Sequence, residues 1–382
     1  MDFERLFARP VIILQPQPFT PTSRFSHCYV EDKLKAMSDL LPSSLRPTLN
    51  DYSNYATIAL LLMHSSSALH EWRNQYPKLI RQKAADERRN LLQTPAIYGF
   101  SPGLVPRPSD YPDHVHIVGS WQPTLGARKP DGKDKADMSL YEEIMSFIDA
   151  AERRGDRIVF IGFGSMLPRD TVHYESMVDR VSKSGNVSVI YQRPGNGIGN
   201  VRQVETSSWW PWSSSKKPKT PLTDTNRVFI LKRSIQHHYF FHRLHAAVIH
   251  GGAGIIATSV RNAVPVVVKP FFGDQFLWCQ MVVSEGWGAC LNKQFTASDV
   301  VKAVQKVLND PAVAVKAAEK ANFVKNEDGF AGFMSASSKE INDWIGSKNV
   351  TSLDDVQVHN MLAKIAATMH DGSVLRQYVN QV

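Results

Sequence analysis

Small and polar residues follow two apolar runs of this chain, and their chemistry suits a ligand with phosphate and hydroxyl groups. The first apolar run, 246–249, is followed by His250, Gly251, Gly252, Ala253 and Gly254. Glycines let a backbone approach a ligand closely. A helix that begins near Gly254 would also direct its free N–H groups at an anion. Because a histidine can donate a hydrogen bond or a charge to the same anion, this segment predicts a phosphate or diphosphate site.

The second apolar run, 264–269, leads to Asp274 and Gln275 a few residues later. A carboxylate that only accepts hydrogen bonds, next to an amide, suits a ligand that is rich in hydroxyl groups. Phosphate and hydroxyl groups together indicate a nucleotide sugar. The alternative interpretation is an ordinary strand-to-helix turn at 250–254, with Asp274 capping a helix.

The two motifs together resemble the donor-binding half of the sterol 3β-glucosyltransferases, which are UDP-sugar-dependent transferases of the GT-B fold. The motifs are HGGAG at 250–254 and PFFGDQ at 270–275. Further similar segments are VFIGFGSM at 159–166, SPGLVPRPSD at 101–110 and FTPTSRF at 19–25. The resemblance therefore extends over roughly residues 10–344.

This resemblance implies a transferase that moves a hexose such as glucose from a UDP-sugar to a sterol or another lipid hydroxyl. The UDP-sugar is a co-substrate, and no metal or other cofactor is expected, because hydrogen-bond donors can stabilise the departing UDP. The resemblance also implies that Gly164 and Ser165 lie against the diphosphate and that His237 lines the nucleotide pocket. The full predicted donor site is Gly164, Ser165, His237, His250, Gly251, Gly252, Ala253, Gly254, Asp274 and Gln275.

Some features of the family are missing from this sequence. The first hundred residues contain neither the Gly-Asp-Val turn of the family nor a recognisable counterpart of its acceptor-activating histidine. The catalytic base is therefore unassigned. Ile255 and Ile256 replace a threonine, and the loss of its hydrogen bond to phosphate would cost roughly 1.5–3 kcal/mol. The isoleucines would weaken donor binding. The missing histidine favours the alternative of a non-catalytic protein that binds nucleotide sugars, a degenerate transferase, whereas the retained Asp274 and Gln275 disfavour it.

The predicted fold class is α/β, GT-B-like, with two Rossmann-like domains facing a cleft and the N-terminal one incomplete. Strands are expected at 11–14, 96–99 and 115–118 in the first domain and at 158–161, 228–231, 246–249 and 264–269 in the second. Ligands of parallel sheets bind beyond the carboxyl ends of the strands, where the site residues would converge. The expected divisions are a partial acceptor-side domain (1–121), a linker (122–139), a UDP-sugar-binding domain (140–346) with a flexible insertion (205–224), and a helical tail (347–382).

The insertion has a composition that suggests contact with a membrane. Tryptophans prefer the headgroup depth of a bilayer and lysines are attracted to anionic lipid. A solvated, disordered loop is the alternative interpretation. The formal net charge of +8 favours anionic partners, but no nucleic-acid recognition motif is present. The residues concerned are Trp209, Trp210, Trp212, Lys216, Lys217 and Lys219.

Three other features bear on metal binding, cofactor and compartment. The histidines His237, His238, His242 and His245 lack an accompanying carboxylate or cysteine ligand, so a metal site is not the preferred interpretation. The glycines around Gly164 lack the third glycine and acidic residue of a dinucleotide fingerprint. Three cysteines without ligand spacing predict no disulfide, and no signal peptide is visible. The expected location is cytoplasmic, with peripheral membrane association through the insertion.

Overall fold

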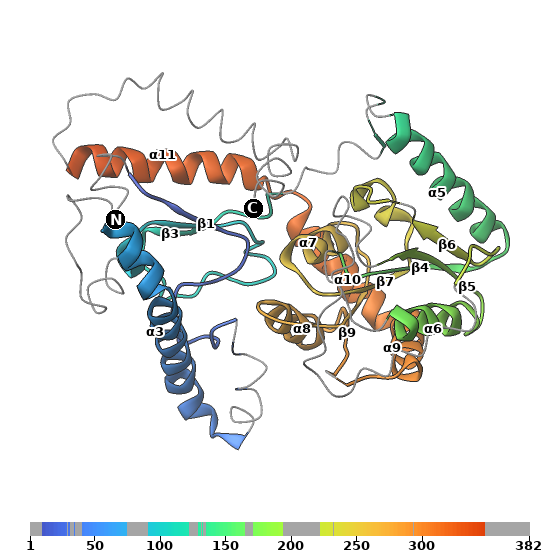
Figure 1. The fold of residues 1–382 in the computed structure, drawn as a ribbon, viewed down its shortest axis with the longest axis horizontal. Coiled ribbons are helices and arrows are strands. Elements are labelled where there is room, and N and C mark those ends of the chain that lie inside the picture. Colours follow the sequence, from blue (N-terminus) through green and yellow to red (C-terminus); the bar gives the residue numbers. More distant parts are fainter. Residues whose placement is uncertain are drawn as a thin grey trace. The chain divides into compact units, whose positions relative to one another are not determined.

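A computed structural model gives the conformation of most of the chain, and the described residues fall into two compact units. Unit 1 comprises residues 1–123 and 326–382, and unit 2 comprises residues 124–325. Each unit has its own all-parallel sheet (Figure 1), as expected for the α/β class. The described residues are 10–28, 30, 34, 40–74, 91–121, 129–130, 132, 135–164, 171–193, 222–231, 233–292 and 294–347.

The sheet of unit 1 has three described strands, β1 (Ile13–Gln15), β2 (Ala96–Tyr98) and β3 (Val115–Ile117), in that order. All three lie where the sequence predicts strands. The 3-10 turn η1 (Ser43–Leu45) leads into the long helix α3 (Arg46–Arg73).

Helix α11 (Gly329–Ser347) completes the core of unit 1. Its Phe333 packs with Ile97 of β2, and both side chains are fully buried. Two polar contacts hold the same region: Ser101 Oγ donates to Glu327 at 2.6 Å, and His116 Nε2 lies 2.7 Å from Glu340. The sequence assigned residues 140–346 to one domain, so the structure corrects this boundary by moving 326–346 into unit 1.

The sheet of unit 2 has six parallel strands in the order β6-β5-β4-β7-β8-β9. In chain order this is third, second, first, fourth, fifth and sixth, the arrangement of doubly wound nucleotide-binding sheets. The strand order reverses between β4 and β7, which are hydrogen-bonded neighbours. The strands are β4 (Arg157–Gly162), β5 (Val187–Gln192), β6 (Val228–Leu231), β7 (Ala246–Ile249), β8 (Val266–Val268) and β9 (Gly288–Cys290).

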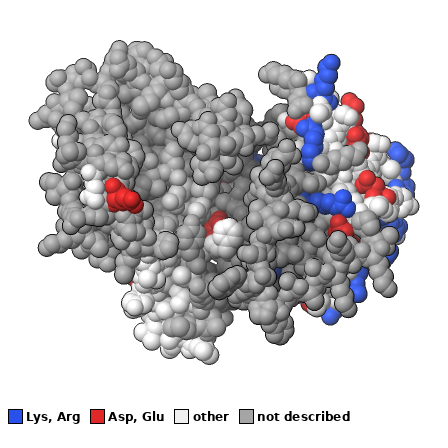
Figure 2. Space-filling model, viewed as in Figure 1, with Lys and Arg blue, Asp and Glu red and all other residues white. Residues whose placement is uncertain are grey.

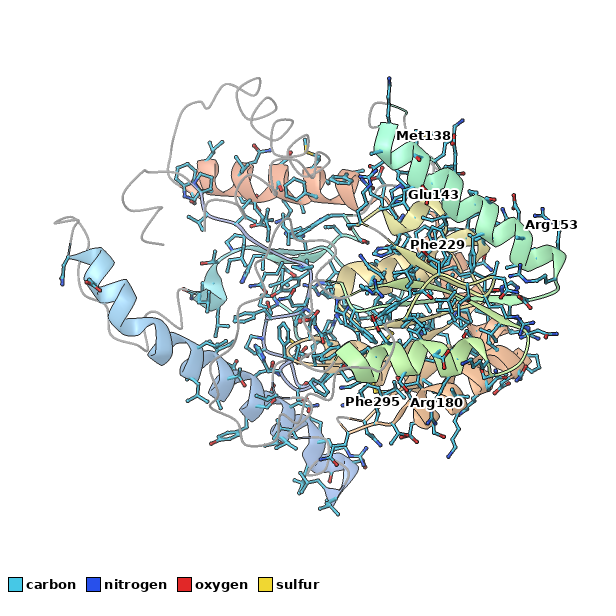
Figure 3. The ribbon with its side chains drawn as sticks, turned by 45° about the vertical axis from the view of Figure 1, so that its right-hand side comes forward. Met138, Glu143, Arg153, Arg180, Phe229 and Phe295 are labelled. Atoms are coloured by element: carbon cyan, nitrogen blue, oxygen red, sulfur yellow. A yellow bond between two sulfur atoms is a disulfide. The ribbon has the colours of Figure 1, made fainter. Side chains whose placement is uncertain are left out.

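Helices cover both faces of this sheet. Helices α6 and α9 pack together over one face, with α5 on the opposite side (Figure 1). In Figure 3, Phe295 lies near one end of α6 and Arg180 further along that helix, while Phe229 of β6 lies close to α5. The helices are α5 (Lys135–Arg153), α6 (Thr171–Ser182), α7 (Ala253–Arg261), α8 (Gln275–Ser284), α9 (Ala297–Asn309) and α10 (Pro311–Val324), with the 3-10 turns η2 (His237–Tyr239) and η3 (Phe241–Arg243).

Local sequence explains several of these helices. Helix α5 buries Leu140, Ile144, Ile148 and Ala151, which recur at the three- and four-residue spacing of one helix face. It begins at Lys135 rather than at 140, so the last five residues of the predicted linker 122–139 are helical. Helix α9 starts with a reciprocal capping box between Thr296 and Asp299.

A buried carboxylate joins three segments at the amino ends of the strands in unit 2. The side chain of Asp156, immediately before β4, is fully inaccessible to solvent. It accepts hydrogen bonds from Arg154 Nε at 3.0 Å, Ser188 Oγ of β5 at 2.8 Å and Arg227 Nη2 at 3.1 Å. Because Arg227 directly precedes β6, this network ties the beginnings of β4, β5 and β6 together.

The structure corrects the prediction about cysteines. Cys279 of α8 and Cys290 of β9 form a disulfide, with their Cα atoms 5.5 Å apart. The sequence spacing does not reveal this pair, because the turn between α8 and β9 brings the two residues together only in the fold. Disulfides persist in oxidising compartments, so cysteine usage no longer supports a reducing location.

The described surface carries both signs of charge, and no described helix is long and apolar enough to cross a membrane. On unit 2, Figure 2 shows Lys and Arg side chains with Asp and Glu among them. The insertion 205–221 and the tail 348–382, with the tryptophans and lysines singled out above, lie outside the described residues.

Candidate functional site

Gly164 and the glycine motif at 250–254 lie where β4 and β7 end, at the reversal of strand order in unit 2. Gly162, the last residue of β4, is the register partner of Ile249, the last residue of β7. Gly164 and His250 follow these two strand ends. Ligands of doubly wound sheets bind at this point, so the topology supports the site independently of the sequence motifs.

The imidazole of His250 packs between two glycines. A Cβ atom added at Gly164 would lie 3.2 Å from the ring Cε1, and one added at Gly252 would lie 2.6 Å from Nε2. A side chain at Gly252 would therefore displace the ring. Gly164 and Gly252 therefore leave the space that the imidazole occupies beside the start of α7.

Gly251 brings the same turn against the start of α8. Its φ of +85° is a conformation that only glycine adopts readily. A Cβ atom there would lie 2.5 Å from Val268 of β8 and 3.4 Å from the carbonyl oxygen of Gln275. The two predicted motifs are therefore in direct contact, as the sequence analysis expected from adjacent strand ends.

The environment of His250 makes it a hydrogen-bonding group rather than a cation near neutral pH. Burial disfavours the charged form and lowers the pKa of His250 to about 4. Its Nδ1 is buried and has no hydrogen-bond partner among the described residues. Buried polar atoms are normally paired, so this nitrogen is a candidate contact for a ligand.

His237 lies beside this site, within an aromatic cluster. Its Nε2 is 3.3 Å from Oε1 of Gln192, the last residue of β5, and its ring contacts Phe160 and Phe241 edge to face. Burial and the neighbouring His250 lower the pKa of His237 to about 4. The prediction that His237 lines the nucleotide pocket fits this position at a strand end but is not tested by it.

The other histidines of this segment do not converge on His237. His245 Nδ1 accepts a hydrogen bond from the Ile158 N–H at 3.1 Å, at the opposite end of β7, and His238 packs against Tyr239. Among the residues that the structure describes, no group of three or more His, Cys, Asp or Glu side chains could hold a metal ion.

Asp274 and Gln275 occupy the start of α8 and have different partners. The Asp274 carboxylate accepts a hydrogen bond from the indole nitrogen of Trp278 at 2.7 Å. Burial raises the pKa of Asp274, although this hydrogen bond favours the ionised form. Gln275 is only 4% exposed, and its Oε1 accepts hydrogen bonds from the backbone N–H groups of Phe271 and Phe272. Its oxygen therefore fixes the loop, which leaves the amide nitrogen as the donor for a ligand.

Three residues of this region were not predicted from the sequence. Gln192 and Trp278 hold His237 and Asp274, and the buried Lys269 follows β8. The Lys269 ammonium donates to the carbonyl oxygen of Pro270 at 2.8 Å and lies over the rings of Phe271 and Phe295. A lysine that directly ends an apolar strand was the available signal for Lys269. Ser165, by contrast, was predicted and lies outside the described residues.

Comparisons with known proteins identify similar glycosyltransferases. Residues 231–327 match the family model for the erythromycin biosynthesis protein CIII-like C-terminal domain. The chain is 31% identical over 271 residues to a sterol 3-beta-glucosyltransferase of Leptosphaeria maculans. It is 28% identical over 270 residues to UDP-sugar-dependent glycosyltransferase 52 of Dictyostelium discoideum. Each alignment covers 69% of this chain.

A solved structure shows the same fold. The structure of CalG4, the calicheamicin glycosyltransferase, has a TM-score of 0.51 and 14% identity, covering 90% of this chain and 71% of that one. The chain spans only about a sixth of the length of the two curated relatives, 16% and 15%. The expected GT-B class of α/β fold is therefore confirmed.

Proposed function

We propose, from the premise that this chain is homologous to the sterol 3-beta-glucosyltransferases and has their GT-B fold, that it binds a UDP-sugar at the carboxyl ends of β4 and β7. The sugar is a hexose such as glucose, and the acceptor is the hydroxyl of a sterol or another lipid. The observation that carries this proposal is the buried Nδ1 of His250, which has no partner among the described residues, at the point where the strand order reverses.

The described residues can supply two of the tasks of hexose transfer. The turn at 250–254 and the start of α7 present backbone N–H groups and a positive helix end to the diphosphate. As the bond between the anomeric carbon and the phosphate oxygen breaks, these donors stabilise the charge that develops on UDP. Asp274 and the amide nitrogen of Gln275 would hold the hexose hydroxyls and orient the anomeric carbon. No metal ion is needed for these steps.

The test is the thermal stability of the purified chain with and without UDP-glucose. A ligand that binds only the folded state at a hundredfold excess over Kd raises stability by about 2.7 kcal/mol. We expect this stabilisation in the wild type. Replacement of His250 by alanine should lower the affinity for UDP-glucose by about tenfold or more, as expected when a hydrogen bond to a charged group is lost.

His245→Ala is the matched control, because His245 and His250 flank the same strand at its two ends. This variant should melt at a lower temperature but keep the full response to UDP-glucose. If a well-folded wild-type sample shows no response to UDP-glucose, the proposed donor site is wrong.

A second prediction separates recognition of the sugar from recognition of UDP. Asp274→Asn should lower the affinity for UDP-glucose about tenfold, because it removes the charged carboxylate that accepts hydrogen bonds from hydroxyls. Trp278→Phe should act in the same direction, because it removes the indole N–H that orients Asp274. Neither change should lower the affinity for UDP alone. Calorimetric titrations with UDP and with UDP-glucose will measure both affinities.

Trp287→Phe provides the control for the tryptophan substitution. Trp278 and Trp287 are both almost fully buried, but the Trp287 indole nitrogen has no partner among the described residues. This variant should bind both ligands as the wild type does. An equal loss of UDP and UDP-glucose affinity in Trp278→Phe would contradict a role for Trp278 in orienting Asp274.

Binding without transfer is the second candidate function. It is favoured by the first hundred residues, which contain no recognisable counterpart of the family's acceptor-activating histidine. Formation of a steryl glucoside from UDP-glucose and a sterol supports the transferase. UDP-glucose binding without such turnover supports the non-catalytic alternative. Membrane contact through the insertion at 205–224 completes the proposal and rests on sequence alone. A cytoplasmic location also rests on sequence alone, and the Cys279–Cys290 disulfide does not favour it.

A further inference from the structure

Unit 1 contains a small cavity that the donor site does not use. Its volume is about 320 Å³, at the lower end of the roughly 300–1,000 Å³ of small-molecule pockets. The walls are mainly apolar and come from two loops, one after β1 and one after β2. The lining residues are Arg24, Phe25, Val105, Pro106, Arg107, Pro108 and Ser109.

A hydrogen-bonded carboxylate holds these two loops together. Asp110 Oδ1 accepts from the Thr22 hydroxyl at 2.7 Å. Asp110 Oδ2 accepts from the backbone N–H and the hydroxyl of Ser23 at 2.7 and 2.9 Å. These hydrogen bonds lower the pKa of Asp110, although partial burial opposes them. The cavity is therefore a built feature of the fold, because its two walls are fixed to each other.

One guanidinium of the cavity is held in place by backbone carbonyl groups. Arg107 Nη2 donates to the carbonyl oxygens of Tyr111 and Pro112 at 2.9 and 2.8 Å, and Nε donates to that of Val115 at 3.4 Å. Its Nη1 has no partner among the described residues. A guanidinium that is positioned in advance loses less conformational freedom when it binds an anion.

The second guanidinium has no competing partner. The Arg24 side chain makes no hydrogen bond or ion pair with any described residue, although its backbone N–H donates to Thr22. The lining of the cavity contains these two arginines and no Asp or Glu. The cavity thus combines apolar walls with two cations that can donate hydrogen bonds.

We propose that this cavity binds an amphiphile with one compact anionic group, such as a phosphate, sulfate or carboxylate. The anionic group lies between Arg24 and Arg107, and the first carbons of the apolar body lie against Phe25 and Val105. The inference is independent of the proposed function, because the cavity is in unit 1 and the donor residues are in unit 2.

Calorimetric titration of the whole chain with octyl phosphate tests this inference. Octyl phosphate should bind with one site per chain, whereas inorganic phosphate and 1-octanol at the same concentration should bind at least about tenfold more weakly. Arg24→Met should lower the affinity for octyl phosphate by about tenfold, which is the lower end of the effect of losing a hydrogen bond to a charged group. Arg24→Lys, which keeps the charge, should restore most of the affinity.

Arg46→Met is the matched control, since Arg46 is an exposed arginine of unit 1 that does not line the cavity. It should leave the affinity for octyl phosphate unchanged. Equal affinities of Arg24→Met and Arg46→Met would overturn the proposal. Binding of inorganic phosphate as tight as that of octyl phosphate would also overturn it, because the apolar walls would then contribute nothing. The Arg24 side chain has no partner among the described residues, so its variants should fold.

Discussion

Asp156→Ala is expected to lower the free energy of unfolding of unit 2 by about 3 kcal/mol. Breaking a buried ion pair by removing one partner costs roughly 3–5 kcal/mol, since the remaining charge is left unpaired. The lower end applies because the side chains of Arg154 and Arg227 are 30% and 34% exposed and can be hydrated. The variant also leaves the buried hydroxyl of Ser188 without its acceptor. Urea denaturation followed by tryptophan fluorescence will measure the change.

Asp179→Ala is the control, because Asp179 makes an exposed ion pair with Lys183 one helical turn away. Such pairs contribute about 0.3–0.5 kcal/mol. Asp156→Asn should fall between the two variants, because the amide keeps an oxygen that can accept from the arginines but loses the charge. If Asp156→Ala and Asp179→Ala unfold at the same urea concentration, the buried network has no special role in stability.

Acidification from pH 7 to pH 5 should destabilise the protein before most carboxylates are protonated. Burial lowers the pKa of His27, His237 and His250 from 6.5 to about 4. Between these two values the unfolded chain binds protons that the folded chain does not. Each histidine therefore makes its full contribution to the free energy of unfolding above about pH 6.5. As the pH decreases from there to 4, that free energy falls by up to about 1.4 kcal/mol per pH unit for each histidine. Asp274 acts in the opposite direction, since its raised pKa favours the protonated folded form.

Urea denaturation at pH 7, 6 and 5 will measure this dependence. His238 and His245 also have lowered pKa values and act in the same direction as these three histidines. His250→Gln removes one of the titrating groups and should reduce the slope by about one histidine's share, whatever its effect on absolute stability at pH 7. A midpoint that does not change between pH 7 and pH 5 would mean that these histidines are hydrated or charged in the folded protein.

The sequence predicts the strands of this protein better than their helical surroundings. Strands 246–249 and 228–231 are found at the predicted residues, because short β-branched runs bounded by polar residues have few other interpretations. The start of α5 was missed, because Lys135 and Asp137 are charged and the first buried residue of the helix is Leu140. The domain boundary at 325 was missed because the sequence does not indicate which sheet α11 covers.

The site was predictable to the extent that its residues directly follow strands. Gly164, His250 and the glycines of the turn converge as expected, because parallel strands end at one edge of a sheet. The partners that orient them were not predictable. Gln192 contacts His237, which lies 45 residues later in the sequence. The indole of Trp278 reaches Asp274 only because both residues are on one face of the helix. Such contacts depend on side-chain direction, which the sequence motifs leave open.

Helix α11 belongs to unit 1 but follows unit 2 in the sequence, so unit 1 is completed last when the chain is synthesised on the ribosome. Ile97 of β2 is covered by Phe333, which emerges more than two hundred residues later. At about 5–20 residues per second, the nascent chain would expose this part of its first sheet for roughly 10–40 s. All strands of unit 2 emerge within that interval. The later unit can therefore complete its fold first, while the apolar face of β2 stays without Phe333 until α11 has been synthesised.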